Sequence, residues 1–365
     1  IGGSPNTQVL ILLNGNPQFM GIMGHPLPDA YVASDVQKVE VIRGPASALY
    51  GSNAMGGVIN IITREPSKDG FQANARILYG SYNTQKYRVN AGFNKKGFHV
   101  LASFHPDQTD GHRDSSEFSI NNGYIDLGYD VNAHFSLKAN FSLAGFDATD
   151  PGKETAHAGN TIDITRGMGS LLLANRFGKT SGSASFFYNF GEHTITDGFH
   201  SRDRNLGAIL YQSLHLFKGN TITLGLDFKS FGGRAENVMA MGGQGMLFVD
   251  TTIQEMAGYA YVQQSFLDHL VINAGMRLEN NSRYGMEPVP SFGVAYNPFP
   301  ATTFKASIAK GFRSPTLREL FMWGTANAEL DPERMINYEA SVLQDLFRKR
   351  LSLELTCFRS EGDNL

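Results

Sequence analysis

The sequence predicts an all-β transmembrane barrel, incomplete at roughly fifteen strands, that follows a small α+β domain. From residue 71 onward, apolar and polar residues alternate with a period of two in segments of about ten residues. Tight turns and long polar connections alternate between these segments. No apolar run approaches the length of a spanning helix, so a chain that crosses a membrane must do so as a closed barrel, which pairs every backbone group.

Composition agrees with a barrel and argues against other classes of protein. Among 365 residues are 40 glycines, 26 phenylalanines and 14 tyrosines, a balance typical of such barrels. A net charge of −3 argues against a nucleic-acid binder, which normally carries a basic stripe. The single cysteine, Cys357, leaves no disulfide framework and is expected to be an inert strand residue. The chain begins at Ile1 in mid-domain without a signal peptide, so we expect a fragment.

The first 38 residues contain a buried strand, a turn and a loop. The continuous apolar run predicts a strand at 8–13, and Asn-Gly-Asn-Pro predicts a turn at 14–17. A loop follows at 18–29 and is unusually rich in methionine and histidine. Residues 29–37 are expected to form a short helix that leads into the next strand.

Residues 39–64 read as strand, helical turn and strand. Pro45 is expected to start the helical turn and Gly51 to end it, positions that suit these two residues. The pair Gly56 and Gly57 allows a tight turn before a β-branched strand at 58–63. A soluble α/β domain could hold a glycine-rich turn of this kind between two strands.

As a whole, this stretch, VEVIRGPASALYGSNAMGGVINIITR, closely resembles the plug-domain signature of the TonB-dependent outer-membrane receptors. The resemblance implies that residues 1–64 are the C-terminal part of a plug that lies inside a barrel. It also implies twenty-two strands, so residues 71–365 are the N-terminal part of the barrel, after a linker at 65–70, and about seven strands are missing.

Alternating segments support the barrel from the residues themselves. Apolar residues occupy every second position at 71–79, 135–143, 222–228 and 351–357. A β-sandwich shows the same alternation with its polar side outward. The number of segments favours a large barrel over a sandwich.

The connections are expected to place short turns at the periplasmic end and long loops at the extracellular end. The tight ones include 83–84, 95–97, 132–133, 218–220, 297–301 and 348–350. The long ones include 107–117, 147–160, 194–204, 232–252 and 322–333.

Two further boxes resemble motifs of the same receptors. Residues 309–320 resemble the "GFRAPTLKELY" box, which marks Phe312, Arg313, Pro315 and Glu319 as barrel-motif residues. Residues 328–333 resemble the "NPNLKPE" box, with departures at its first two positions. Haem-uptake members commonly have a histidine between the two boxes, and residues 321–327 contain none, which weakens a haem interpretation.

The plug resemblance also assigns roles within the signature. In the family the arginine at the position of Arg43 and nearby acidic plug residues take part in charged contacts between plug and barrel wall, and Glu40 is the expected partner. Alternatively, Arg43 only holds the plug's own strands together. The predicted signature and gating residues are Glu40, Arg43, Gly44, Pro45, Tyr50, Gly51, Gly56 and Gly57.

The loop at 18–29 matches, by position, the plug loop that points to the cell exterior and touches the ligand. Its predicted ligand-binding residues are Gln18, Phe19, Met20, Met23 and His25. Met239, Met241 and Met246 add thioethers from the barrel loop at 232–252. Thioether and imidazole suit soft metals such as copper(I), and methionine also suits a bulky apolar ligand. The third possibility is that these side chains only pack the apex, so no metal is assigned.

The resemblance implies TonB-dependent uptake of a ferric siderophore, cobalamin or another metal chelate across the outer membrane of a Gram-negative bacterium. Copper or haem uptake by the same family is the alternative, and a passive channel or adhesion barrel is a more distant one. The implied partners are the ligand, the lipid bilayer and TonB, which would bind a box upstream of Ile1. Scattered histidines and the lack of HExxH or GxSxG predict no enzyme activity, and no cofactor is expected.

Overall fold

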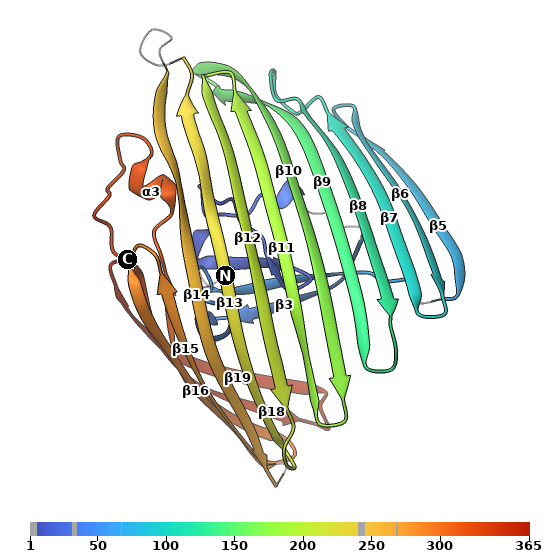
Figure 1. The fold of residues 1–365 in the computed structure, drawn as a ribbon, viewed down its shortest axis with the longest axis vertical. Coiled ribbons are helices and arrows are strands. Elements are labelled where there is room, and N and C mark those ends of the chain that lie inside the picture. Colours follow the sequence, from blue (N-terminus) through green and yellow to red (C-terminus); the bar gives the residue numbers. More distant parts are fainter. Residues whose placement is uncertain (1–5, 31–34, 67, 240–244, 268) are drawn as a thin grey trace.

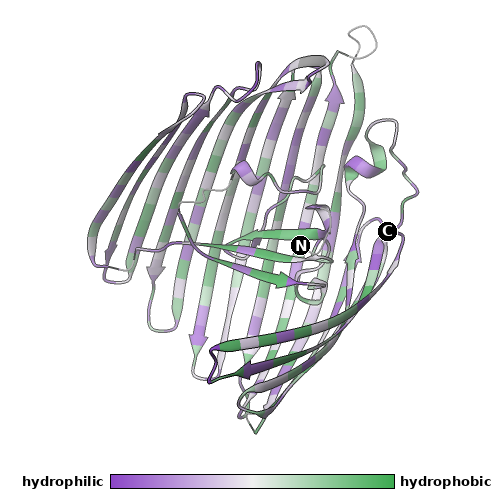
Figure 2. Cartoon of the chain, turned by 180° about the vertical axis from the view of Figure 1, so that it is seen from behind, coloured by the Kyte–Doolittle hydropathy of each residue, from purple (hydrophilic) through white to green (hydrophobic). Residues whose placement is uncertain are grey.

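A computed structural model describes residues 6–30, 35–66, 68–239, 245–267 and 269–365. Its largest part is an antiparallel sheet of fifteen strands, which curves into an open arc (Figure 1). A separate four-stranded sheet from the N-terminal residues lies within the concave side of that arc (Figures 1 and 2). This arrangement confirms the incomplete barrel with an α+β domain inside.

The N-terminal domain is built around one parallel strand pair. β1 (Val9–Leu13) pairs in parallel with β4 (Gly57–Thr63), and the sheet order is β2-β1-β4-β3. Its other elements are η1 (Asn6–Gln8), β2 (Asn16–Pro17), η2 (Pro28–Ala30), β3 (Val36–Arg43) and α1 (Ser47–Tyr50). Its core consists of Leu10, Leu12, Phe19, Ala54 and Val58.

Two local predictions in this domain differ from the structure. The helix α1 begins at Ser47 instead of Pro45, because the amide of Ala46 donates to the carbonyl of Ala54 and belongs to a turn. β3 already begins at Val36, so the helix predicted for 29–37 is wrong at its C-terminal end. Residues 31–34, in the middle of that prediction, lie outside the described residues.

The barrel strands run in chain order, each antiparallel to the next. They are β5 (Gly70–Gly80), β6 (Thr84–Lys95), β7 (Phe98–Thr109), β8 (Phe118–Asp130), β9 (Phe135–Lys153), β10 (Ala156–Phe177), β11 (Thr180–Ile195), β12 (Phe199–Leu214), β13 (Asn220–Asn237), β14 (Met246–Phe266), β15 (Leu270–Asn281), β16 (Gly285–Phe299), β17 (Thr302–Arg313), β18 (Glu333–Leu346) and β19 (Leu351–Asp363). A short helix, α3 (Leu317–Phe321), lies between β17 and β18.

The two faces of the sheet differ as alternation predicts. On β11, Ser185 and Asn189 face inward, because they hydrogen-bond Asn16 and Pro17 of the N-terminal domain, each at 2.7 Å. Between them, Phe186 and Tyr188 point outward and are 52% and 40% exposed. Apolar and polar residues alternate along the strands in the same way across the sheet (Figure 2). The outer face is therefore apolar and the inner face polar, as in a transmembrane barrel.

Several strands extend further than their sequence patterns predict. The sequence predicts a long loop at 147–160, but β9 and β10 remain paired through Asp150 and Asn160. Likewise, β11 and β12 pair as far as Thr194 and His200. Backbone pairing beyond the bilayer needs no apolar alternation, which explains why these extensions were missed. Among the described residues, no helix is long and apolar enough to cross a membrane.

Candidate functional site

The N-terminal domain is fastened to the barrel by the two segments that stood out in the sequence. The Ser47 Oγ accepts a hydrogen bond from the amide of Phe312 at 3.3 Å, and the Ser52 Oγ accepts one from the amide of Ser314 at 3.1 Å. Phe312 is 2% exposed and packs against Ala48. The signature around α1 and the end of β17 thus form one contact.

Arg313 organises the connection that follows β17. Its guanidinium pairs with Glu319 of α3 at 2.8 Å and with Glu333 at the start of β18. Glu319 also completes a capping box with Thr316, which begins α3 directly after the buried Pro315. Burial pushes the pKa of Glu319 upward, but hydrogen bonds from Arg313 and Thr316 outweigh burial and leave the pKa below its ordinary value.

A buried charge network lies beneath α1. Arg277 is fully buried and binds Asp227 and Glu279, each at 2.7 Å, while Lys229 binds Glu255 at 2.9 Å. These charges face inward from β13, β14 and β15, and the sequence alone does not predict which of them pair. Charges at every second position of a strand indicate that these side chains share one face, but they do not identify the partners on other strands.

Gly51 shows how closely the N-terminal domain approaches this network. Its φ of +76° is left-handed, and a Cβ atom there would lie 2.5 Å from a carboxylate oxygen of Glu279. It would also lie 2.9 Å from Arg277 Nη2. Both the backbone conformation and the space therefore require glycine at the end of α1.

The other predicted signature residues have structural roles or lie on the surface. Gly44 and Gly57 adopt positive φ, and the amide of Gly56 donates to the carbonyl of Gln8. Pro45, just before α1, and Tyr50, its last residue, are half-buried. The expected contact between Glu40 and Arg43 is wrong, because residues three apart on a strand point to opposite faces. Glu40 pairs with Lys38 at 2.6 Å, and the Arg43 side chain is exposed.

The loop after β2 is largely packed against the barrel. Gln18, Phe19 and Met20 are 7%, 8% and 2% exposed, and Gln18 Nε2 lies 2.9 Å from the Met168 sulfur. Met23 and His25 are only partly buried, and Met23 packs against the cluster around Ile22. Among the five predicted ligand residues, these two thus remain accessible at the apex of the domain.

An aromatic group at the end of the sheet that carries α3 adjoins this apex. The mouth cluster, as we call it, consists of Phe199, Phe248, Phe321, Trp323, Arg283 and Arg318. Trp323 is 44% exposed, and its ring centroid lies 5.9 Å from Phe199 and 6.0 Å from Phe248. The guanidinium of Arg318 lies 5.2 Å from the Trp323 ring, and that of Arg283 lies 5.3 Å from Phe321.

Backbone contact joins the mouth cluster to the apex. The amide of Arg318 donates to the carbonyl of Ile22 at 3.1 Å, and Leu317, Leu320 and Met322 bury Ile22 to 1% exposure. The sequence predicts the motif around Arg313 but not the cluster that α3 carries. The feature of the sequence that could have indicated this cluster is Trp323, the one tryptophan of the chain.

Candidate metal ligands are sparse in the described part of the chain. Within it, no group of three or more His, Cys, Asp or Glu side chains could hold a metal ion. Met239 and Met246 are exposed by 61% and 41%, whereas Met241 lies outside the described residues.

Comparison with protein families accounts for this architecture. Residues 64–365 match the model of the TonB dependent receptor-like β-barrel, and residues 1–58 match that of the TonB-dependent receptor plug domain. The chain belongs to the TonB-dependent receptor family. Its N-terminal domain is therefore a plug, its sheet is part of an outer-membrane barrel of the Gram-negative type, and it is not an enzyme.

Individual relatives differ in what they are named for. The iron-regulated outer membrane virulence protein of Vibrio cholerae is 26% identical over 89% of this chain and 53% of its own length. The vitamin B12 transporter BtuB of Vibrio vulnificus is 22% identical over 100% of this chain and 60% of its own. The siderophore receptor PirA of Pseudomonas aeruginosa superimposes with a TM-score of 0.77 at 19% identity, covering 99% of this chain and 68% of PirA. This chain thus spans little more than half the length of the curated relatives.

Proposed function

We propose that the full-length protein takes up a metal chelate across the outer membrane by TonB-dependent transport. Two features support active uptake over a passive channel. A folded plug lies within the arc of the barrel, and buried hydrogen bonds between plug and barrel fasten it there. A barrel of this size needs a gate, and opening the gate requires work from outside the protein. TonB, acting on a segment upstream of Ile1, is the proposed source of that work.

We infer the class of ligand from the exposed ring of Trp323. This ring lies close to two phenylalanine rings and to the guanidinium of Arg318. The backbone of Trp323 has a φ of +65°, a conformation that costs a non-glycine residue about 1 to 2 kcal/mol. An exposed apolar ring held in a costly conformation beside Arg318, in a cluster that also contains Arg283, suits a ligand that is both planar and anionic. A ferric chelate with aromatic groups fits this description, and the accessible Met23 and His25 would meet it from the plug.

Copper uptake is supported less well by the apex. Met20 is 2% exposed and packs into the loop, so its sulfur cannot join Met23 and His25 around an ion above the apex without rearrangement. Cobalamin, a bulky and largely apolar ligand, remains the second candidate because Met23 and Trp323 offer adaptable apolar contacts.

Binding by the purified full-length receptor tests the ligand class. The probes are a ferric catecholate chelate, a ferric hydroxamate chelate, cyanocobalamin and copper. We expect the catecholate to bind most tightly and Trp323→Ala to weaken its binding by roughly tenfold, about 1.4 kcal/mol. Phe141→Ala removes an outward-facing ring of β9 and serves as the matched control. Equal binding of the catecholate by Trp323→Ala and wild type would contradict the proposed site.

A further inference from the structure

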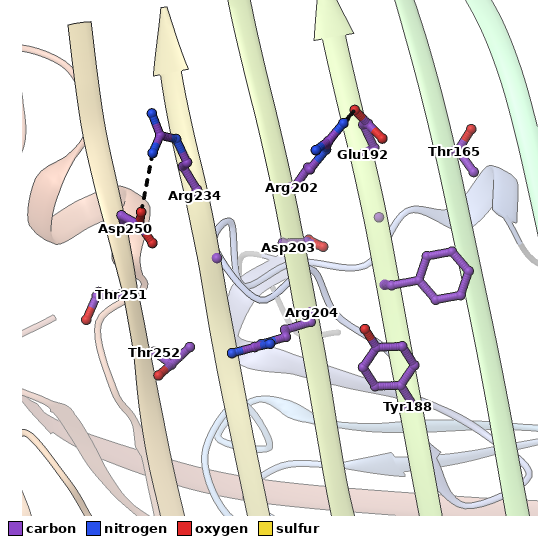
Figure 3. A pocket seen from close by; sticks show the side chains of 13 residues that line it. Thr165, Tyr188, Glu192, Arg202, Asp203, Arg204, Arg234, Asp250, Thr251 and Thr252 are labelled. Carbon is purple, nitrogen blue, oxygen red and sulfur yellow. Dashed lines mark hydrogen bonds and ion pairs between the residues drawn. The ribbon is translucent and has the colours of Figure 1, made fainter.

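A polar cavity opens on the outer wall of the barrel, away from the plug. It has a volume of about 700 Å³ and lies across strands β10 to β14 (Figure 3). Asp203 of β12 faces inward, where it binds the buried Arg166, so its neighbours Arg202 and Arg204 point outward. Figure 3 shows these arginines in front of the strands, with the plug behind them. The cavity therefore faces the surroundings of the barrel and is separate from the proposed chelate site.

Three arginines dominate this cavity. Arg202 pairs with Glu192 at 2.7 Å, and Arg234 lies 3.6 Å from Asp250 and 2.7 Å from Glu236. Within the described part of the chain, Arg204 has no carboxylate partner, and its side chain is exposed. Of the outward-facing charges that line the cavity, three are positive and two, Glu192 and Asp250, are negative. An anion would therefore meet one arginine, Arg204, that no carboxylate of the described residues already engages.

The position of these arginines along the barrel axis places them at the edge of the hydrocarbon layer. β12 ends at Leu214, next to the turn at the end opposite α3. Ten residues of a strand tilted by about 40° rise roughly 26 Å, close to the ~25 Å apolar band of such barrels. Arg204 thus lies where the outer leaflet changes from acyl chains to headgroups, and Tyr188 and Phe190 of the same cavity fit the aromatic girdle of that level.

An apolar groove lies below the cavity on the same strands. Its volume is about 880 Å³, and small outward residues form its floor: Ala184, Ala208, Gly258 and Ala260. Larger outward residues form its walls: Leu210, Leu226, Phe228, Met256 and Met276. Ala208 follows Arg204 by four residues on β12, a separation of about 13 Å along the strand. Polar cavity and apolar groove therefore follow one another along the same strip of the outer wall.

We propose that this strip binds one lipid of the outer leaflet, with a phosphate of its headgroup at the three arginines and an acyl chain in the groove. Guanidinium groups bind phosphate through paired hydrogen bonds, and basic clusters at the membrane surface recognise anionic headgroups. The groove, about 880 Å³ in volume, gives an acyl chain a depression in a wall that bulky outward side chains otherwise cover. The order of the two features, charge above and groove below, matches the order of headgroup and chain in that leaflet.

Binding of a phosphorylated glycolipid to the full-length receptor tests this proposal by native mass spectrometry in detergent. The probes are diphosphoryl lipid A, the same lipid after removal of its phosphates, and inorganic phosphate. We expect diphosphoryl lipid A to stay bound and Arg204→Gln and Ala208→Phe each to reduce its retention at least fivefold. Wild type is expected to retain the dephosphorylated lipid only weakly, to the same extent as Arg204→Gln retains the intact lipid. Inorganic phosphate is not expected to be retained.

Matched controls keep the result specific. Lys153→Gln removes an exposed positive charge at the same end of the barrel, and Ala139→Phe adds a ring to the outer face of β9, three strands away. Both should retain lipid as wild type does, and all variants should keep the heat-dependent gel mobility of a folded barrel. Equal retention by Arg204→Gln, or by wild type with the dephosphorylated lipid, would overturn the headgroup site. Retention unaffected by Ala208→Phe, or a receptor dimer that this variant disrupts, would overturn the groove as an acyl-chain site.

Discussion

The hydroxyl of Ser52 accepts a hydrogen bond from the backbone amide of Ser314 at 3.1 Å, although 262 residues separate the two. Ser52 follows α1 of the plug, and Ser314 follows the last strand residue before α3. A few residues away, Ile22 at the plug apex and Arg318 of α3 also share a backbone hydrogen bond. The plug therefore contacts the connection that carries the mouth cluster in two places, which gives a ligand at that cluster a direct structural link to the plug.

Gly51→Ala should loosen the plug within the barrel. A Cβ atom would collide with the Glu279 carboxylate and strain a left-handed backbone, at a cost on the order of 2 kcal/mol. Cells with the full-length variant should become several-fold more sensitive to a large antibiotic that enters only through an open barrel. Gly145→Ala is the control, since a Cβ atom there meets nothing within 4 Å. Equal sensitivity of both variants would show that this contact does not hold the plug in place.

The alternation of apolar and polar residues was enough to predict about fifteen strands, because each strand is apolar on the membrane side. It could not predict how far strands continue outside the bilayer, where pairing at Thr194 and His200 needs no apolar face. For that reason Arg202 and Arg204, expected in a loop at 194–204, were not recognised as outward-facing strand residues. The contact of Gly51 with Arg277 was also beyond prediction, since it depends on how two domains dock and not on local pattern.

Acidification should release the loop that carries Trp323. In the folded protein the pKa of Glu319 lies below its ordinary value of 4.5. The ion pair with Arg313 therefore stabilises the loop fully above pH 4.5, and this stabilisation is lost as the pH falls from 4.5 through the lower pKa of the folded state. We expect the emission of Trp323, taken as the difference from Trp323→Phe, to shift toward longer wavelength below about pH 4.5. Glu319→Gln should show the shifted emission at neutral pH, whereas Glu329→Gln, at an exposed position, should behave as wild type. A pH profile unchanged in Glu319→Gln would rule out this ion pair as the cause.

Replacement of both Met23 and His25 by alanine should weaken chelate binding about fivefold while barrel assembly stays intact, because both side chains are accessible at the apex. Met20→Ala should instead reduce stability, by roughly 2 to 5 kcal/mol, because it empties a buried site. Ligand titration and thermal unfolding of the purified full-length receptor separate the two effects. Unchanged binding of every chelate and of copper by the double variant and by the triple variant that adds Met20→Ala would show that the loop only packs the apex.

Uptake in cells with and without TonB tests the central claim most directly. The full-length receptor is expressed in both strains, and accumulation of the radiolabelled ferric chelate inside the cell is measured beside its binding at the surface. We expect surface binding to be equal in the two strains and accumulation to fall to background without TonB, because the docked plug closes the barrel and nothing else supplies the work to move it. Undiminished accumulation in the strain without TonB would contradict the account.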